Sequence, residues 1–259
     1  MKGSEVQQRL AQEGFAILPD VLSRAEAAML RARLWRAADE SERRGVPTRS
    51  VGIDPNEHNV RVFNLIDLDE AFVRLISHPL AIDIVTGLLG PGFLISNFTA
   101  NIALPGSRSM VLHSDQSVVI PEPWHYPWAI NIIWCLTDVR VENGATLYLP
   151  DSHRATRAGE LPADPLSRLK PFEAKSGSVI AMEGRLWHTS GANMTEDEER
   201  ALLFGYYSKD FIRPQMNWNA ALSTETIAAL SPEMHTWLGL GANANVKLSV
   251  PLAARLRHS

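Results

Sequence analysis

Two histidines and one aspartate are spaced in this sequence as the ligands of one metal ion could be. His113 and Asp115 are separated by a single residue, and His188 follows after a long interval. In a β-strand, residues i and i+2 point to the same face, so one strand can present both His113 and Asp115 to a metal. Two imidazoles and one carboxylate form the facial ligand set that holds ferrous iron and leaves coordination positions open. The pattern therefore predicts a catalytic iron site made of His113, Asp115 and His188.

Arg200 begins the next apolar segment after His188 and offers a second kind of chemistry. A hairpin through the polar turn 192–199 would place these two residues directly opposite each other, with Cβ atoms about 5 Å apart. A planar guanidinium can bind a carboxylate through two parallel hydrogen bonds. An iron beside such an arginine is what a 2-oxoglutarate-dependent oxygenase requires, so we expect 2-oxoglutarate as cosubstrate and O2 as oxidant. Ser190, on the same segment as His188, is predicted as a further contact to the cosubstrate.

The N-terminal elements that must support this site are predicted to be helical. Ser23 and Glu26 form a capping box, and the helix that follows is predicted to run to about Ala38. A charged loop is expected from Glu40 to Ser50. A second helical region covers 70–89 and is predicted to break at a proline.

Short β-type segments follow and should carry the site. They are predicted at 93–104, 128–137, 145–149, 178–182 and 201–208. Helices followed by strands favour a mainly β (α+β) fold, in which N-terminal helices buttress an antiparallel core. We expect a single domain over 1–259, with a helical part at about 1–92, a β core at about 93–211 and a C-terminal extension at 212–259.

A segment rich in proline and aromatic residues, 121–128, lies between the Asp115 segment and the next predicted strand. Its three prolines forbid regular structure, while Trp124 and Tyr126 offer stiff aromatic surface. The segment is predicted to lie over the mouth of the β core, where it either plugs the end or forms a wall of the substrate pocket. In the second case, Trp124 and Tyr126 bind a largely apolar substrate.

Asparagines inside apolar segments are candidates for ligand contacts. Asn64, Asn97, Asn101 and Asn131 each need a partner, because burying an amide without one costs about 1–3 kcal/mol. Asn131 lies between two isoleucines, and we predict that it faces 2-oxoglutarate, with a structural hydrogen bond as the alternative. Asn64 is predicted to hold the substrate.

Composition indicates a single globular protein that acts on a small molecule. With 259 residues, 45% of them apolar, the chain can bury a sizeable core. A net charge of −4 gives no basic footprint, so nucleic acid is not an expected partner. We see neither a secretory signal nor an apolar run of ~20 residues, so no membrane span is expected. Cys135 is the only cysteine and is predicted to be buried; this suits the cytoplasm, and a homodimer is the assembly to test.

Several short motifs occur in an order that resembles the phytanoyl-CoA dioxygenase family of iron and 2-oxoglutarate oxygenases. Beside the residues above, they include 61–65, 104–106, 142–146 and 149–154, and the resemblance extends from residue 13 to about 211. It implies a double-stranded β-helix (a cupin-like jelly roll), with His113, Asp115 and His188 as iron ligands and Arg200 as the 2-oxoglutarate arginine. One departure is that family members often carry a glutamine shortly before the first ligand, where this chain has Met110-Val111.

The predicted reaction is the oxidation of a C–H bond in a largely apolar small molecule, an intermediate of a natural product or other secondary metabolite. Hydroxylation is the default outcome, and desaturation, epoxidation or cyclisation are alternatives. An acyl-CoA or a small amino acid derivative remains an alternative substrate. A cupin-type metal-dependent lyase or isomerase is the alternative enzyme, although a Lewis-acid reaction needs no Arg200. A non-catalytic metal-binding domain is the third alternative.

Overall fold

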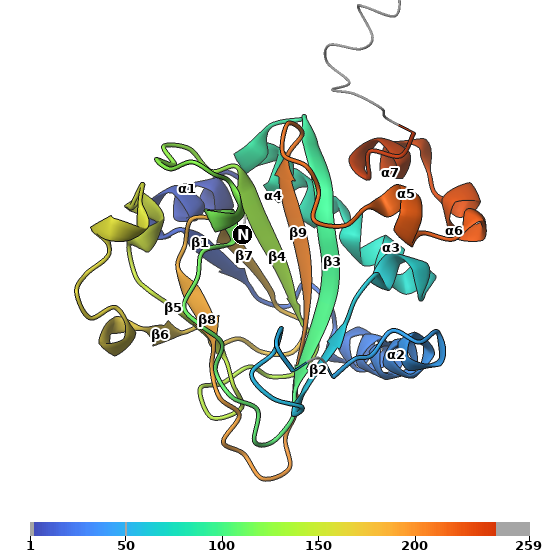
Figure 1. Ribbon diagram of the computed structural model, residues 1–259, viewed down its shortest axis with the longest axis horizontal. Coiled ribbons are helices and arrows are strands. Elements are labelled where there is room, and N and C mark those ends of the chain that lie inside the picture. The colour runs from blue at the N-terminus through green and yellow to red at the C-terminus, as the bar shows by residue number, and fades with distance from the viewer. Residues whose placement is uncertain (1–2, 50, 242–259) are drawn as a thin grey trace, which may run out of the picture.

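Two antiparallel sheets face each other in the computed structural model of the protein, which describes residues 3–49 and 51–241 (Figure 1). The larger sheet has the strand order β1-β7-β4-β9-β3-β2, and the smaller has the order β6-β5-β8. Their bounds are β1 Phe15–Leu18, β2 Asn59–Val62, β3 Phe93–Ala103, β4 Ala129–Cys135, β5 Thr146–Tyr148, β6 Lys170–Pro171, β7 Val179–Glu183, β8 His188–Ser190 and β9 Arg200–Lys209. The arrangement is the predicted jelly roll with added helices.

All five segments predicted as strands are strands, namely β3, β4, β5, β7 and β9. Those without a clear prediction, β1, β2, β6 and β8, are two to four residues long. Segments this short cannot show an alternating pattern. Because β1 and β2 complete the larger sheet, the N-terminal part supplies strands as well as helices.

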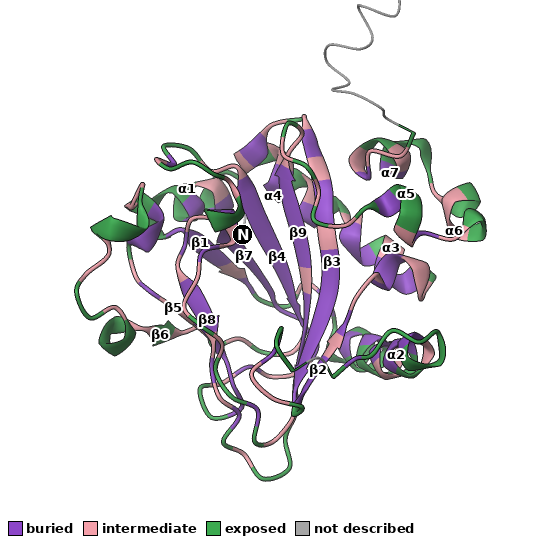
Figure 2. Ribbon diagram, viewed as in Figure 1, coloured by how far each residue is buried: buried purple, intermediate pink, exposed green. Residues whose placement is uncertain are grey.

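The two faces of the larger sheet pack against different hydrophobic clusters. Along β4, Ile130, Ile132 and Trp134 pack into the core cluster that the helices share, while Ile133 and Cys135 point to the space between the sheets. This alternation follows from the two-residue period of a strand and makes both faces of β4 buried (Figure 2). Cys135 is fully buried, and burial raises the pKa of its thiol to about 12, as expected for a residue with an apolar role.

Helices cover the outer face of the larger sheet. They are α1 Gly3–Glu13, α2 Arg24–Arg43, α3 Glu70–Ile76 and α4 Pro79–Leu89. The predicted capping box of α2 is confirmed: the Glu26 backbone N–H donates to Ser23 Oγ at 3.2 Å, and the Ser23 N–H donates to Glu26 Oε2 at 2.8 Å. Leu30 and Leu34, on the face predicted to be apolar, are buried.

The predicted end of α2 near Ala38 is wrong, as is the predicted loop from Glu40. The helix continues to Arg43. Glu40 accepts a hydrogen bond from Arg44 Nε at 2.7 Å, a pairing of positions i and i+4 that favours helix. Gly45 then takes a positive φ of 78° and ends the helix.

By length and composition alone, residues 70–89 are long and apolar enough to span a membrane. In the structure they form two helices, α3 and α4, with the predicted break before Pro79. His78 Nδ1 accepts a hydrogen bond from the Leu80 N–H at 3.2 Å and caps α4. The apolar side chains of both helices, such as Phe72 and Ile84, are buried in the core. Packing against the sheet thus accounts for the composition of this stretch.

The chain after β9 returns to the larger sheet through α5 Trp218–Ala221, α6 Thr224–Ala229 and α7 Pro232–Trp237. Trp218 Nε1 donates to the Ile95 carbonyl at 2.7 Å, and the Gln215 N–H donates to Ser96 Oγ at 3.0 Å. Ser223 Oγ donates to Asp67 Oδ1 at 2.7 Å. The predicted extension is therefore part of the fold up to residue 241; residues 242–259 lie outside the described residues, and the single-domain organisation stays a prediction.

His188 and Arg200 do not form the predicted hairpin pair. β8 pairs with β5 in the smaller sheet, whereas β9 lies between β4 and β3 in the larger sheet. A jelly roll passes consecutive strands between its two sheets, and the turn between these residues makes that passage. Asn193 shapes the turn by donating to the Ala103 and Glu198 carbonyls at 2.9 and 2.7 Å.

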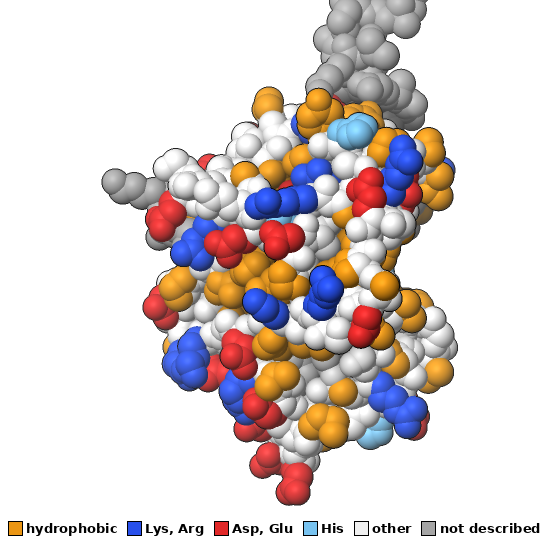
Figure 3. All heavy atoms as spheres, turned by 90° about the vertical axis from the view of Figure 1, so that its left-hand side faces the viewer, with side chains coloured by type: hydrophobic (Ala, Val, Ile, Leu, Met, Phe, Trp, Pro, Cys, Tyr) orange, Lys and Arg blue, Asp and Glu red, His pale blue; other side chains and the backbone are white. Residues whose placement is uncertain are grey.

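The face of the molecule on the left of Figure 1 carries charges of both signs. In Figure 3, basic and acidic side chains alternate around a patch of apolar ones, and neither sign forms a continuous area. This face therefore shows no basic patch of the kind that binds nucleic acid.

We expect Ser23→Ala to lower the free energy of unfolding by about 1 kcal/mol, because it removes the side-chain cap of α2. Urea denaturation followed by circular dichroism measures the change. Ser4→Ala is the control, since Ser4 lies on the exposed surface of α1 and its side chain makes no hydrogen bond in the described part of the chain. Equal stability of the two variants would contradict the capping role.

Candidate metal centre and the cavity beside it

His113, Asp115 and His188 meet at one end of the space between the sheets. One ligand atom from each lies within 4.8 Å of the others. His113 Nε2 is 3.9 Å and His188 Nε2 is 3.8 Å from Asp115 Oδ1. This spacing suits three ligands around one metal ion, and two imidazoles with a carboxylate favour ferrous iron.

A pair of backbone hydrogen bonds sets the distance between the two histidines. The His113 N–H donates to the His188 carbonyl at 2.9 Å, and the His188 N–H donates to the His113 carbonyl at 2.8 Å. His113 thus forms an isolated bridge rather than part of a strand, and Asp115 begins a 3-10 helix, Asp115–Val118. The prediction that one regular strand presents both residues is wrong. Ser114 leaves the ladder instead, because its hydroxyl donates to the Gly184 carbonyl at 2.8 Å.

Both imidazole rings are oriented by carbonyl groups of their own segments. His113 Nδ1 is 2.8 Å from the Val111 carbonyl, and His188 Nδ1 is 2.9 Å from the Leu186 carbonyl. Each Nδ1 must carry a proton to donate this bond, which leaves the Nε2 lone pair free for a metal. Burial lowers the pKa of His188 and so favours the neutral form that binds a metal.

The third ligand is held by neighbours on the inner face of the larger sheet. Asn131 Nδ2 on β4 donates to Asp115 Oδ2 at 3.1 Å, and Tyr206 on β9 donates its hydroxyl to the Asp115 backbone carbonyl at 3.0 Å. Asn131 Oδ1 is buried and has no hydrogen-bond partner in the part of the chain that the structure describes. Burial also raises the pKa of Tyr206, so its phenol remains protonated and able to donate. Asp115 Oδ1, which neither residue engages, lies nearest the two histidines.

Arg200 is a buried cation on the same inner face. Its side chain donates to the Gly144 carbonyl at 3.0 Å and to the Asn101 carbonyl at 3.2 Å. Within the described residues, no carboxylate lies within ion-pairing distance of it. Burial, helped by the nearby charge of Arg61, lowers the pKa of Arg200 to about 10, so the group is still cationic at neutral pH.

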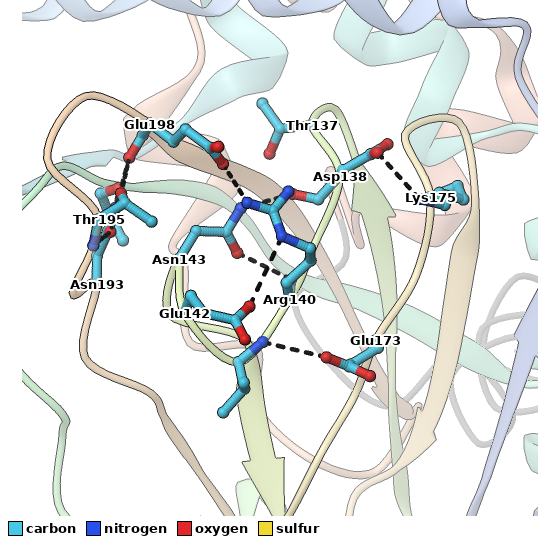
Figure 4. Close-up of polar contacts among 12 residues, drawn as sticks. Thr137, Asp138, Arg140, Glu142, Asn143, Glu173, Lys175, Asn193, Thr195 and Glu198 are labelled. Carbon is cyan, nitrogen blue, oxygen red and sulfur yellow. Dashed lines mark hydrogen bonds and ion pairs between the residues drawn. The ribbon is translucent and has the colours of Figure 1, made fainter.

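The Gly144 carbonyl that receives Arg200 belongs to a loop fixed by polar contacts (Figure 4). Asn143 accepts from the Arg140 N–H at 2.9 Å and donates to the Asp138 carbonyl at 2.9 Å. Arg140 extends to Glu198, on the turn that leads to Arg200. The loop and the turn are therefore tied together on both sides of the guanidinium.

A cavity of about 200 Å³ connects the metal ligands to Arg200. The cavity is lined by all six residues that the sequence predicted for the metal and the cosubstrate: His113, Asp115, Asn131, His188, Ser190 and Arg200. The other lining residues are Ile53, Arg61, Phe63, Asn97, Thr99, Asn101, Met110, Thr146, Phe204, Tyr206 and Gln215.

The residues predicted to bind substrate do not line this cavity. Asn64 turns away and donates to the Ala221 carbonyl at 2.7 Å, which fixes the end of α5. Trp124 is buried, with its indole N–H donating to the Val119 carbonyl at 2.8 Å, and Tyr126 is 68% exposed. The segment 121–128 thus has the contacts of a structural plug.

Several cavity residues were given no role in the sequence analysis. Arg61 forms a double hydrogen bond with Asp54, at 2.8 and 2.6 Å. It lies in 61–65, one of the motifs that resemble the family, and this position could have indicated a role in the site. Thr99 and Tyr206 could have been found from strand periodicity, since they share a face with Asn101 and Arg200 respectively. Gln215 follows the last strand and carried no pattern.

Comparison with known proteins agrees with this geometry. The sequence model of the phytanoyl-CoA dioxygenase (PhyH) family matches residues 10–201. Dioxygenase af480 of Aspergillus fumigatus is 49% identical over 236 residues, which cover 91% of this chain and 76% of that protein. EctD of S. alaskensis, solved with 2-oxoglutarate and 5-hydroxyectoine, has 20% identity and a TM-score of 0.69 over 84% of this chain and 82% of its own. SnoK, a carbocyclase from nogalamycin biosynthesis, has 20% identity and a TM-score of 0.64 over 88% and 90%.

A jelly roll with a His-x-Asp…His cluster at the mouth of its inner cavity defines a non-haem iron oxygenase of the 2-oxoglutarate-dependent class. The chain belongs to the phytanoyl-CoA dioxygenase family. The predicted fold, enzyme class and cofactors, namely Fe(II), 2-oxoglutarate and O2, are thereby confirmed.

We expect Asn131→Ala to weaken metal binding by about 10- to 100-fold, because Asp115 loses the donor that orients its carboxylate. Titration of Co(II) into the metal-free protein measures the affinity. Asn97→Ala is the matched control, since Asn97 also lines the cavity but donates to Gln215 instead. Equal Co(II) affinities for the two variants would show that Asn131 has no part in holding the metal.

Proposed function

We propose that His113, Asp115 and His188 hold the iron, and that Arg200 binds the distal carboxylate of 2-oxoglutarate. The observation that carries this proposal is the unpaired charge of Arg200. A guanidinium that is 1% exposed and lacks a carboxylate partner among the described residues costs several kcal/mol in the absence of a ligand. A carboxylate bound in the same cavity removes that cost.

The charges in the cavity fit a dicarboxylate. Arg61 is neutralised by Asp54, whose side chain is fully buried, so Arg200 is the cation left over at its end of the cavity. Asp115 supplies a single negative charge at the other end, fewer than a divalent iron carries. A ligand with one carboxylate for Arg200 and a second for the iron balances both ends.

Two neighbouring residues complete the proposed cosubstrate site. Asn131 Oδ1 has no partner within the described structure and lines the cavity, so it can accept from a hydroxyl or a water beside the ligand. Ser190 lines the cavity between His188 and Arg200. Its hydroxyl oxygen accepts from the Met110 N–H at 3.0 Å, which leaves its proton available for donation. We place the second cosubstrate contact here, because Met110 offers no side-chain amide.

With O2 and 2-oxoglutarate, the iron supplies the oxidising power to break a C–H bond of the substrate. The protein has three tasks. Asp115 and the histidines orient the iron, Arg200 and Ser190 fix the cosubstrate, and the buried cavity wall excludes water. Tyr206 holds the Asp115 backbone while keeping its own proton.

The proposed substrate is a largely apolar small molecule, an intermediate of secondary metabolism, and hydroxylation is the default outcome. The likeness in fold to SnoK, a carbocyclase from nogalamycin biosynthesis, supports this class. A lyase or isomerase that used the metal as a Lewis acid would have no use for the buried Arg200. We place the enzyme in the cytoplasm because a reduced thiol and ferrous iron suit that compartment.

We expect Arg200→Ala to raise the KM for 2-oxoglutarate by about 30-fold or more, which corresponds to about 2 kcal/mol of lost binding. Succinate formation measures the turnover of the cosubstrate. The control is 2-oxobutyrate, which lacks the distal carboxylate: its weak use should change little between wild type and variant. An equal loss for both 2-oxo acids would place Arg200 outside the carboxylate site.

We also expect Asp115→Ala to abolish stoichiometric Fe(II) binding while the fold is retained, because two histidines alone make an incomplete site. Metal analysis after dialysis and circular dichroism measure the two quantities. Normal iron content in this variant would refute the assignment of the three ligands.

A further inference from the structure

Exposed aliphatic side chains gather around a hollow beside the candidate metal centre. Val51 is 72%, Ile53 is 54% and Val111 is 84% exposed. With Pro55 and Met110, these residues line an open hollow of about 540 Å³ that reaches His113. Exposed aliphatic residues scattered singly are ordinary, but several around one concave surface mark a binding site.

The hollow adjoins the inner cavity. Ile53, Met110 and His113 line both spaces. The inner cavity, at about 200 Å³, is less than half as large, and under the proposed function it must contain the iron and 2-oxoglutarate. A substrate larger than the remaining space must therefore extend outward past Ile53 and Met110.

The carboxylate that lines the hollow is neutralised by an arginine. Within residues 3–49 and 51–241, Asp54 is the only carboxylate that lines the hollow, and its buried side chain pairs with Arg61 at 2.8 and 2.6 Å. Arg61 Nη2 also lies 3.8 Å from Met110 Sδ, so the same guanidinium contacts Asp54 and Met110, which lie on the two segments that line the hollow. The ion pair fixes the backbone of 51–55, while Val51 and Ile53 remain exposed.

We infer that this hollow binds the carbon skeleton of the prime substrate, and that the substrate is a neutral, mainly hydrocarbon molecule. The inference rests on the proposed function, since it takes His113 as the end of the path. Among the described residues, no lysine or arginine lines the hollow to pair with the phosphates of a CoA thioester. The surface thus favours an uncharged, mainly hydrocarbon molecule over an acyl-CoA.

The test uses Nile red, a neutral apolar dye, with protein that carries Ni(II) and 2-oxoglutarate. Val51→Asp should weaken dye binding by about tenfold, because a carboxylate replaces apolar contact area. Ile120→Asp is the matched control: Ile120 is an exposed aliphatic residue (86%) that lies outside the hollow, and its affinity should equal that of wild type. Equal dye affinity in wild type and Val51→Asp, or a loss in Ile120→Asp alone, would overturn the inference.

A covalent block provides a second test. Cys135 is fully buried with a pKa raised to about 12, so a cysteine introduced by Val51→Cys is the one that monobromobimane should modify. The attached label should prevent Nile red binding, whereas a label on Ile120→Cys should not. Progesterone, a neutral polycycle, should displace the dye from the unlabelled protein and octanoyl-CoA should not. Tighter displacement by the thioester would overturn the proposed substrate class.

Calorimetric titration of 2-oxoglutarate into the Ni(II)-loaded protein separates the two proposals. Retained 2-oxoglutarate binding in Val51→Asp with weakened dye binding supports both. Retained 2-oxoglutarate binding with unchanged dye binding refutes the hollow alone. Absence of 2-oxoglutarate binding in the wild type refutes the proposed function, whatever the dye does.

Discussion

The buried charge of Arg200 is the constraint on which the inner face of the protein depends. Two backbone carbonyls accept from the guanidinium, but carbonyl groups alone do not neutralise a cation removed from water. The loop around Gly144 must be rigid to present its carbonyl, which explains the contacts among Asn143, Arg140 and Glu198. The neighbouring Arg61 must bring its own carboxylate, since a second unpaired cation would raise the cost further.

The two sheets contribute different kinds of segment to the site. The larger sheet contributes the long, regular strands β3, β4 and β9, whose inner positions hold polar side chains at fixed spacing. The smaller sheet contributes short strands and irregular segments, and the candidate metal ligands lie at its edge. Irregular backbone is useful there, because a regular ladder would not bring Nε2 of both histidines and Asp115 Oδ1 within 4.8 Å.

Residue types and spacing in the sequence were enough to predict the five longer strands, the capped helix and four residues that prove to line one cavity, His113, Asp115, His188 and Arg200. The predictions that failed needed long-range information. The hairpin of His188 with Arg200 assumed that consecutive strands pair, but the jelly roll sends them to different sheets. Asn64 and Trp124 were predicted to contact the substrate, and neither lines the cavity. Both side chains instead find backbone carbonyls nearby, which no local pattern could indicate.

One part of the cavity wall comes from the chain after the last strand. Gln215 follows the last strand and lies beyond Ala201, where the match to the family ends, yet it lines the same space as the iron ligands. Its segment is attached to β3 by hydrogen bonds at Ser96 rather than by a sheet ladder. A substitution at Gln215 can therefore reshape the chamber without altering Arg200 or the three candidate metal ligands.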